Sequence, residues 1–117
     1  MAVQIRRQED VLVASIQASL SDADLLALRD ALVEGVSESR ARGVIVDMTC
    51  LDVVDFFASS TLLGLAQMIR LRGARMLIVG IQPHVAFAMV QLGITLEGAQ
   101  VALDLQEGLA CLGSPSY

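Results

Sequence analysis

Three short and almost unbroken apolar runs recur along this chain, at residues 11–16, 44–48 and 76–79. Runs of this length, rich in valine and isoleucine, are typical of β-strands that are covered on both faces. Each run is separated from the next by a stretch with helical periodicity. Strands that alternate with helices predict an α/β fold with a largely parallel sheet.

Two weaker segments complete the predicted sheet. Residues 3–7 alternate between apolar and polar, which suits a half-exposed edge strand that turns at residues 8–10 into the first apolar run. A last short strand is expected at 100–102. The expected architecture is a mixed, largely parallel sheet of about five strands with about four helices. It forms one domain over residues 1–113, followed by a loose tail at 114–117.

The helices are predicted from their apolar spacing and from their terminal residues. Ser21 and Asp24 form a capping-box-like start to the first helix, and Gly43 is expected to close it as a C-cap. Asp55 is the expected N-cap of a second helix that runs to about Leu71. One stripe of the first helix is apolar: Leu25, Leu28, Leu32 and Val36. The third helix is expected to run from Pro83 to Gly93. A final helix is expected over 105–112, with Asp104 as its cap and Glu107 in its first turn.

The composition of the 117 residues limits the class of protein. Hydrophobic residues make up 55% and charged residues only 18%, which excludes a disordered chain. All eight basic residues are arginine and the net charge is -5, so a nucleic-acid partner is not expected. Cys50 and Cys111 are too few for a disulfide framework, and we expect them to be free thiols.

Charge is unevenly distributed along the chain. Residues 1–58 carry the whole net charge, whereas the second half is neutral. A domain with so little charge is expected to leave apolar surface that a partner covers. Residues 76–96 carry no formal charge, but Gly80 and Pro83 divide them into a strand, a turn and a helix better than into a membrane span. No signal peptide is visible, and the expected location is the cytoplasm.

Motifs for catalysis or cofactor binding are missing from the sequence. There is no G-x-G-x-x-G, no Walker loop and no G-x-S-x-G. The single histidine, His84, is interpreted as a surface or helix-end imidazole. Asp47, Asp52 and Asp55 cluster at one strand–loop–helix junction and could hold Mg²⁺ for an enzyme, but such chemistry would also need a lysine, and the chain has none. We therefore expect no catalytic residue, metal or cofactor, with Asp52 shaping a turn and Asp55 capping the helix.

Two long segments and two short motifs resemble a known family. The long segments are 43–55 (GVIVDMTCLDVVD) and 80–94 (GIQPHVAFAMVQLGI). Both are similar to STAS domains, the anti-sigma-factor antagonist family. The motif RGAR before residue 76 and the motif ALDLQEGL ending at Leu109 resemble the RsbS-like scaffold proteins of the bacterial stressosome. The resemblance covers nearly the whole chain.

The resemblance implies a STAS-like fold and a non-enzymatic role. Family members bind partner proteins, typically switch kinases of the histidine-kinase-like ATPase fold. RsbS-like proteins form large cages with RsbR-type co-scaffolds, and the cage holds a kinase until the scaffold is phosphorylated. The implied partners are therefore an RsbR-type STAS co-scaffold and an RsbT-like serine/threonine switch kinase or an anti-sigma factor, in a homo- or hetero-oligomer. A cofactor, a nucleic acid or a membrane is not implied.

The resemblance also places the family's phosphorylated serine or threonine directly after Asp55, where this chain has Phe56. Three interpretations follow. In the first, Phe56 makes a permanent contact with a partner, and the protein is a constitutive scaffold. In the second, regulation has moved to Ser59 or Ser60 in the same helix. In the third, Phe56 belongs to the core and the switch lies on another subunit. The first is narrowly preferred to the third. The second ranks last, because a kinase reaches a hydroxyl inside a formed helical turn less easily than one at the cap.

The composition of the second helix also favours a binding role. From residue 56 to residue 69 it carries no charge, whereas a solvent-facing helix normally does. Two alternatives remain open: neighbouring loops cover this face, or the cleft beside the helix binds a small ligand such as a nucleotide. The expected partner-binding residues are Asp55, Phe56, Ser59, Ser60 and Leu63.

Overall fold

The apolar runs form the middle of a five-stranded sheet in which the strands lie in the order β1-β2-β3-β4-β5. The computed structural model describes residues 3–94, 96 and 99–113. The first pair of strands is antiparallel and the other three pairs are parallel, as the sequence predicts. The strands are β1 (Val3–Gln8), β2 (Val11–Ile16), β3 (Gly43–Asp47), β4 (Arg75–Val79) and β5 (Gln100–Ala102).

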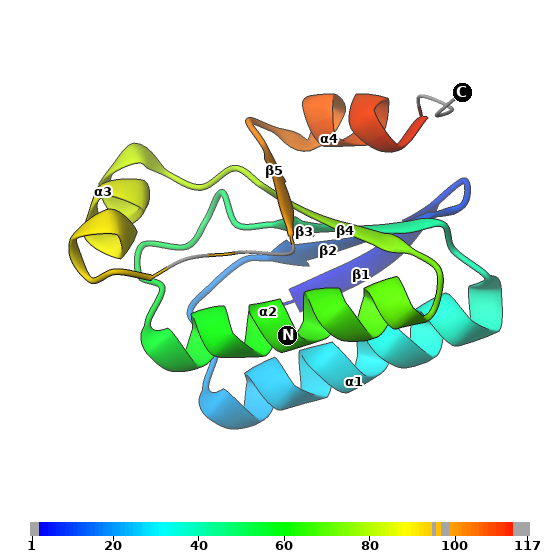
Figure 1. Ribbon diagram of the computed structural model, residues 1–117, viewed down its shortest axis with the longest axis horizontal. Coiled ribbons are helices and arrows are strands. Elements are labelled where there is room, and N and C mark those ends of the chain that lie inside the picture. The colour runs from blue at the N-terminus through cyan, green and yellow to red at the C-terminus, as the bar shows by residue number, and fades with distance from the viewer. Residues whose placement is uncertain (1–2, 95, 97–98, 114–117) are drawn as a thin grey trace.

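Four helices pack around the sheet within the described residues. They are α1 (Asp22–Ser39), α2 (Phe56–Leu71), α3 (Pro83–Gln91) and α4 (Leu105–Gly113). Figure 1 shows α1 and α2 side by side on one face of the sheet, α4 on the opposite face, and α3 at one end. Because α1 and α2 each connect neighbouring parallel strands, they run in the same direction.

The central strands are buried on both faces, which explains their continuous apolar sequence. Val44, Val46 and Ile78 belong to the core under α1 and α2. Ile45 and Leu77 point the other way, because successive side chains of a strand alternate between faces, and they pack near α4. Burying one such side chain contributes about 1.5–3 kcal/mol. These two cores hold the sheet in place between its helices.

The capping box at the start of α1 is confirmed. The Ser21 hydroxyl accepts from the Asp24 N–H at 3.1 Å, and the Asp24 carboxylate accepts from the Ser21 N–H at 3.3 Å. The predicted C-cap at Gly43 is wrong. α1 ends earlier, with Arg40 in the left-handed region at φ 53°, and Gly43 begins β3. A Cβ on Gly43 would lie 2.6 Å from Cδ1 of Leu112, so the glycine leaves room for this buried side chain of α4.

The structure also bears on the predictions for a membrane span, for the uncharged segment and for the cysteines. Within the described ranges, none of the helices is both long and apolar enough to traverse a bilayer. The uncharged segment from residue 76 divides into β4, a turn and α3, as expected. Cys50 and Cys111 are exposed free thiols. The predicted loose tail at 114–117 lies outside the described residues.

Candidate functional site

The loop between β3 and α2 is held by local hydrogen bonds and by two apolar anchors. The Asp47 carboxylate accepts from the Thr49 N–H at 3.0 Å and from its hydroxyl at 2.6 Å. Gln82 donates from its side chain to the Thr49 carbonyl, which connects the loop to the start of α3. Leu51 and Val54 are buried in the core. These contacts fix the path of the loop and therefore the position at which α2 begins.

The three aspartates of this junction are engaged separately. Asp47 accepts from Thr49, Asp55 caps α2, and Asp52 lies 3.7 Å from Nε2 of His84 at the exposed start of α3. Asp52 lies in a bend of this loop, directly after the turn that the Leu51 N–H closes by donating to the Met48 carbonyl. Across the residues that the structure describes, no group of three His, Cys, Asp or Glu side chains is placed to hold a metal ion.

Asp55 caps α2 as predicted. Its backbone is extended, and Oδ1 accepts from the N–H of Ala58 at 2.8 Å. The cap makes Phe56 the first residue of the helix, and 58% of its surface is exposed. The interpretation of Phe56 as a core residue is therefore wrong. In this chain an aromatic ring faces solvent at the position that the family resemblance assigns to a phosphorylated hydroxyl.

The other expected partner-binding residues do not all share one face. Ser59 is buried, with 3% of its surface exposed, and its hydroxyl donates to the Phe56 carbonyl at 3.0 Å. Ser60 is exposed, and Leu63 is half-buried on the flank of the helix. Ser59 thus faces the core with the buried stripe of α2. Of the two serines, only Ser60 presents its hydroxyl to solvent.

The outer face of α2 is uncharged and open. We call it the α2 face and define it by five exposed residues: Phe56, Phe57, Ser60, Gln67 and Met68. The opposite face packs on the sheet as predicted, through Leu62, Leu65, Ala66 and Ile69. Loops from the described part of the chain do not cover the α2 face, so that alternative from the sequence does not hold.

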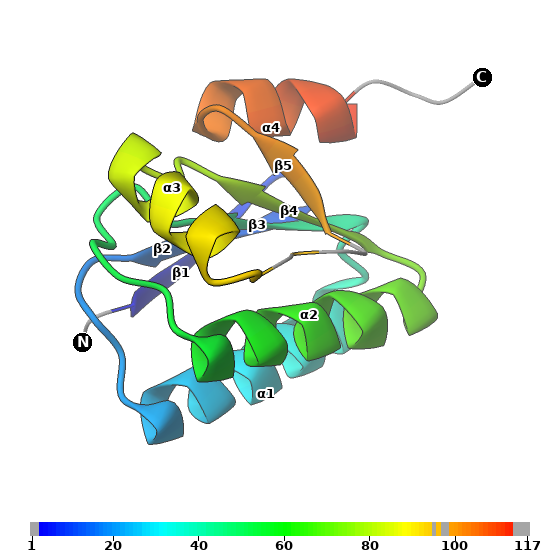
Figure 2. The same ribbon diagram turned by 60° about the vertical axis from the view of Figure 1, so that its left-hand side comes forward.

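The sequence analysis did not identify the exposed apolar residues in the loop before α2 and on α3. Val53, in the loop before the helix, is 69% exposed, and Phe87 and Val90 of α3 are 65% and 79% exposed. Figures 1 and 2 place α3 and the start of α2 at the same end of the molecule. The sequence did contain a signal for the exposure of Phe87. Val85 and Met89 form the buried i, i+4 pair of α3, and Phe87 lies on the opposite side of the helix.

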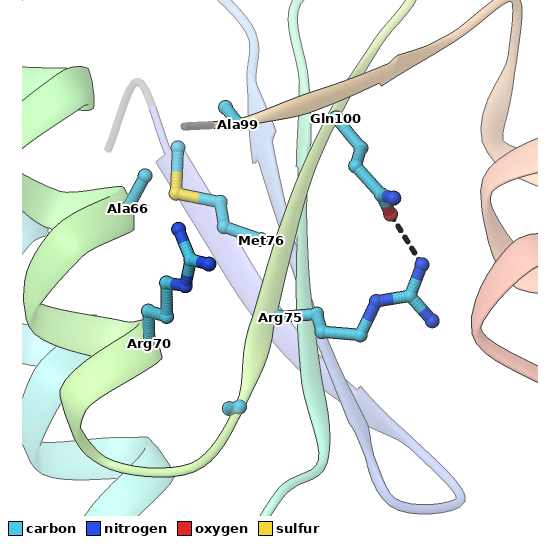
Figure 3. Close-up of a pocket in the computed structure, with 7 residues that line it drawn as sticks. Ala66, Arg70, Arg75, Met76, Ala99 and Gln100 are labelled. Atoms are coloured by element: carbon cyan, nitrogen blue, oxygen red, sulfur yellow. Dashed lines mark hydrogen bonds between the residues drawn. The ribbon is translucent and has the colours of Figure 1, made fainter. Parts of the chain in front are cut away.

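A cavity lies at the other end of α2, between this helix and the β4–β5 edge (Figure 3). Its volume is about 330 Å³, at the lower end of the range usual for small-molecule sites. Arg70 points into it from α2, whereas Arg75 turns towards Gln100 and donates to its side-chain oxygen. Guanidinium groups favour an anionic ligand. This cavity is where a small ligand beside the second helix would fit.

Sequence comparisons identify a family and a curated relative. The profile of the STAS domain matches residues 2–108. RsbRA of Bacillus subtilis (strain 168), described as an RsbT co-antagonist protein, is 29% identical over 101 residues. The match covers 86% of this chain and 37% of RsbRA, so the chain spans little more than a third of that relative's length.

Solved structures are similar over almost the whole chain. A serine-to-glutamate variant of RsbS from Moorella thermoacetica is 28% identical with a TM-score of 0.81, covering 97% of this chain and 96% of that one. A chain from a structure of the stressosome is 25% identical with a TM-score of 0.74. The match covers 94% of this chain and 96% of that one. Unphosphorylated SpoIIAA, an anti-sigma factor antagonist, is 13% identical with a TM-score of 0.72, covering 94% and 96%, a likeness of fold alone. These similarities confirm the expected STAS-like architecture.

Proposed function

Because the chain belongs to the STAS-domain family, we propose that it is a non-enzymatic protein–protein interaction module of a bacterial stress or sigma-factor signalling pathway. STAS anti-sigma antagonist domains are typically non-catalytic signalling modules. The proposed partners are an RsbR-type STAS co-scaffold and an RsbT-like switch kinase or an anti-sigma factor. The likeness to RsbRA, an RsbT co-antagonist, and to a stressosome chain supports these partners.

The exposure of Phe56 carries the proposal. A phenylalanine at the first position of a helix leaves a large apolar ring in water. Such a ring contributes most to the free energy of binding when a partner buries it. Asp55 fixes the helix end, and Val53 lies exposed just before it. Buried aromatic anchors supply much of the binding energy in protein interfaces. We propose that Phe56 is such an anchor, with Val53, Asp55, Ser60 and Leu63 around it.

The same residue makes the contact permanent. A phosphate at this position would add about -1.5 to -2 charges beside a helix N-terminus, which is favourable for the anion and disruptive for an apolar interface. Phe56 has no hydroxyl and cannot acquire this charge. The proposed role is therefore that of a constitutive scaffold. Phosphorylation at this position cannot release the bound partner.

A binding experiment tests the anchor. The Kd for an RsbR-type STAS protein and for an RsbT-like kinase is measured with the native chain and with Phe56→Ala. We expect Phe56→Ala to lose about 2 kcal/mol, roughly 30-fold in Kd, as for an interface hot spot. The control is Val101→Ala, an equally exposed apolar residue on edge strand β5. Equal affinity of Phe56→Ala and the native chain for both partners would refute the proposal.

A gain of phosphorylation tests the absence of a switch. Phe56→Ser restores a hydroxyl at the first position of α2, and we expect an RsbT-like kinase to label it and to bind it less tightly afterwards. The native chain should remain unlabelled. Labelling of the native chain that Ser60→Ala abolishes would mean that regulation has moved along the helix.

Small-ligand binding is the alternative function, and the cavity beside Arg70 is the observation that favours it. Calorimetry with a panel of nucleotides distinguishes the two functions. Micromolar binding that Arg70→Ala abolishes would support a ligand-binding module. Heats indistinguishable from dilution would leave the interaction module as the function of the chain.

A further inference from the structure

A hollow lies between the C-terminal ends of α1 and α2, which Figure 1 places at the same end of the molecule. Its volume is about 460 Å³, within the range usual for small-molecule sites. Three arginines line it, Arg40, Arg42 and Arg72, together with small or apolar residues and no acidic residue of the described chain. We call it the arginine hollow. It shares no lining residue with the cavity beside Arg70.

Two of the three arginines have no ionic partner among the described residues. Arg42 is engaged, because its Nε lies 2.7 Å from the Asp10 carboxylate and its Nη1 donates to the Leu112 carbonyl. The side chains of Arg40 and Arg72 form no hydrogen bond or ion pair with the described chain. Two guanidinium charges therefore line the hollow without a counter-charge.

The acidic residues at this end of the molecule do not fill the hollow. Glu34 and Glu38 of α1 and Glu9 of the β1–β2 turn are exposed, and none of them lines it. Asp10 is already paired with Arg42. These acids weaken the positive potential around the hollow, within about 10 Å at 0.1 M salt. Binding of an anion here would therefore depend on direct contact with the guanidinium groups.

The fold does not require the side chains of Arg40 and Arg72. Arg40 has φ 53°, in the left-handed region where glycine is the favoured residue at a helix end. A cation is generally favourable near a helix C-terminus. At the end of α2, however, the carbonyls of residues 68–70 already accept from the backbone N–H groups of residues 72–74. Both guanidinium groups thus remain available to a ligand.

We infer that the arginine hollow binds a small anion that carries two or more phosphate groups. A guanidinium group presents its N–H donors in a planar fork that matches two phosphate oxygens. Two unpaired guanidinium charges are neutralised by more than one negative charge, which an oligophosphate supplies. The described lining contains no aromatic residue on which a nucleobase could stack. The recognised group is therefore the phosphate chain, either free or as part of a nucleotide.

This site is independent of the proposed partner contact. Phe56 is the first residue of α2, and the hollow lies at the other end of this helix, about 24 Å away along its axis. Phe56→Ala should therefore bind an oligophosphate with native affinity. Failure of the anion site and failure of the proposed anchor can then be distinguished.

Calorimetric titration with inorganic tripolyphosphate, in magnesium-free buffer at low salt, tests the site. We expect Arg40→Gly and Arg72→Gln each to weaken binding by about tenfold or more, because each removes charged hydrogen bonds to the phosphate oxygens. Arg6→Gln is the charge-matched control and should keep native affinity. Arg6 is an exposed residue of β1 and pairs with Val13, which belongs to the core on the α4 side of the sheet.

Arg40→Gly also separates binding from folding. Because glycine adopts the left-handed conformation readily, this variant should be at least as stable as the native chain in urea titrations. A folded Arg40→Gly variant that no longer binds tripolyphosphate would support a direct role for the guanidinium group. ATP should bind no more tightly than tripolyphosphate, since the hollow offers nothing to the base.

Several results would overturn the inference. The first is a native chain that gives only heats of dilution. The second is an equal loss of affinity in Arg6→Gln and Arg72→Gln, which would indicate attraction to any exposed arginine. The third is binding that Arg70→Ala abolishes and Arg40→Gly does not, which would place the ligand in the other cavity. Binding of ATP without binding of tripolyphosphate, or tighter binding of a glutamate-rich peptide, would also contradict a phosphate site.

Discussion

Asp55 and Phe56 are adjacent, yet Asp55 stabilises the start of the helix and Phe56 forms part of the surface. Asp55 satisfies a backbone N–H in the first turn of α2, a need that any helix start has. The Phe56 carbonyl accepts from the Ser59 hydroxyl, whereas the Phe56 side chain is exposed. A structural role at one residue and a surface role at the next are consistent with a binding site built onto a fixed helix end.

The cap makes a measurable contribution to stability. Asp55→Ala removes the acceptor for the Ala58 N–H, and we expect the free energy of unfolding to fall by about 0.5–2 kcal/mol in urea titrations. Asp52→Ala is the matched control, because Asp52 is highly exposed and does not cap the helix. An equal loss of stability in both variants would show that the cap is not the cause.

A surface ion pair predicts how stability responds to acid. Arg42 lies with Nε 2.7 Å from the Asp10 carboxylate, and its hydrogen bond holds the pKa of Asp10 below the usual value of 3.8. A lowered pKa means that the folded state favours the charged form. The contribution is therefore complete above the usual pKa and is lost as the pH falls through the lowered one.

The test compares Asp10→Asn with the native chain in urea. The native chain should be the more stable at neutral pH, and the two should converge in strongly acidic solution. The difference will be small, because exposed ion pairs contribute little. A difference that persists unchanged at the lowest pH would mean that the carboxylate charge is not involved.

Among whole elements, α2 combines two unlike faces. Its buried stripe explains why it packs on the sheet, and its spacing was visible in the sequence. Its outer face lacks the charges that usually keep a surface helix in solvent. The charge pattern predicted an unusual face, but only the packing of α1 and of the loops around it showed that this face is open.

Gly64 offers a test of α2 as an isolated element. Gly64→Ala should raise the free energy of unfolding by about 0.4–1 kcal/mol, because alanine is the better helix former and its Cβ meets open space. The measurement is a urea titration at a concentration low enough for monomers. Gln67→Ala, a nearby exposed position, should change stability much less. A destabilised Gly64→Ala variant would mean that Gly64 has a role within the chain.

At the scale of the whole molecule, the sheet lies between α1 and α2 on one face and α4 on the other (Figure 1). Each face has its own core, so the outer surfaces of these helices are what the chain offers to other molecules.

Several features of this protein were determined by the sequence itself. The strand and helix order, the caps at Ser21 and Asp55, and the buried stripe of α2 were all predicted, because periodicity and capping depend on residues close together in the chain. The family resemblance in segments 43–55 and 80–94 likewise needed no coordinates.

Only the tertiary structure decided the exposure of particular side chains. Ser59 and Ser60 are neighbours of the same type, yet one faces the core and the other faces solvent. Gly43 looked like a helix cap, but it makes room for Leu112, almost seventy residues away. Phe56 was compatible with the core or with a contact surface. These outcomes depend on which distant elements pack against a residue, and local sequence does not contain that information.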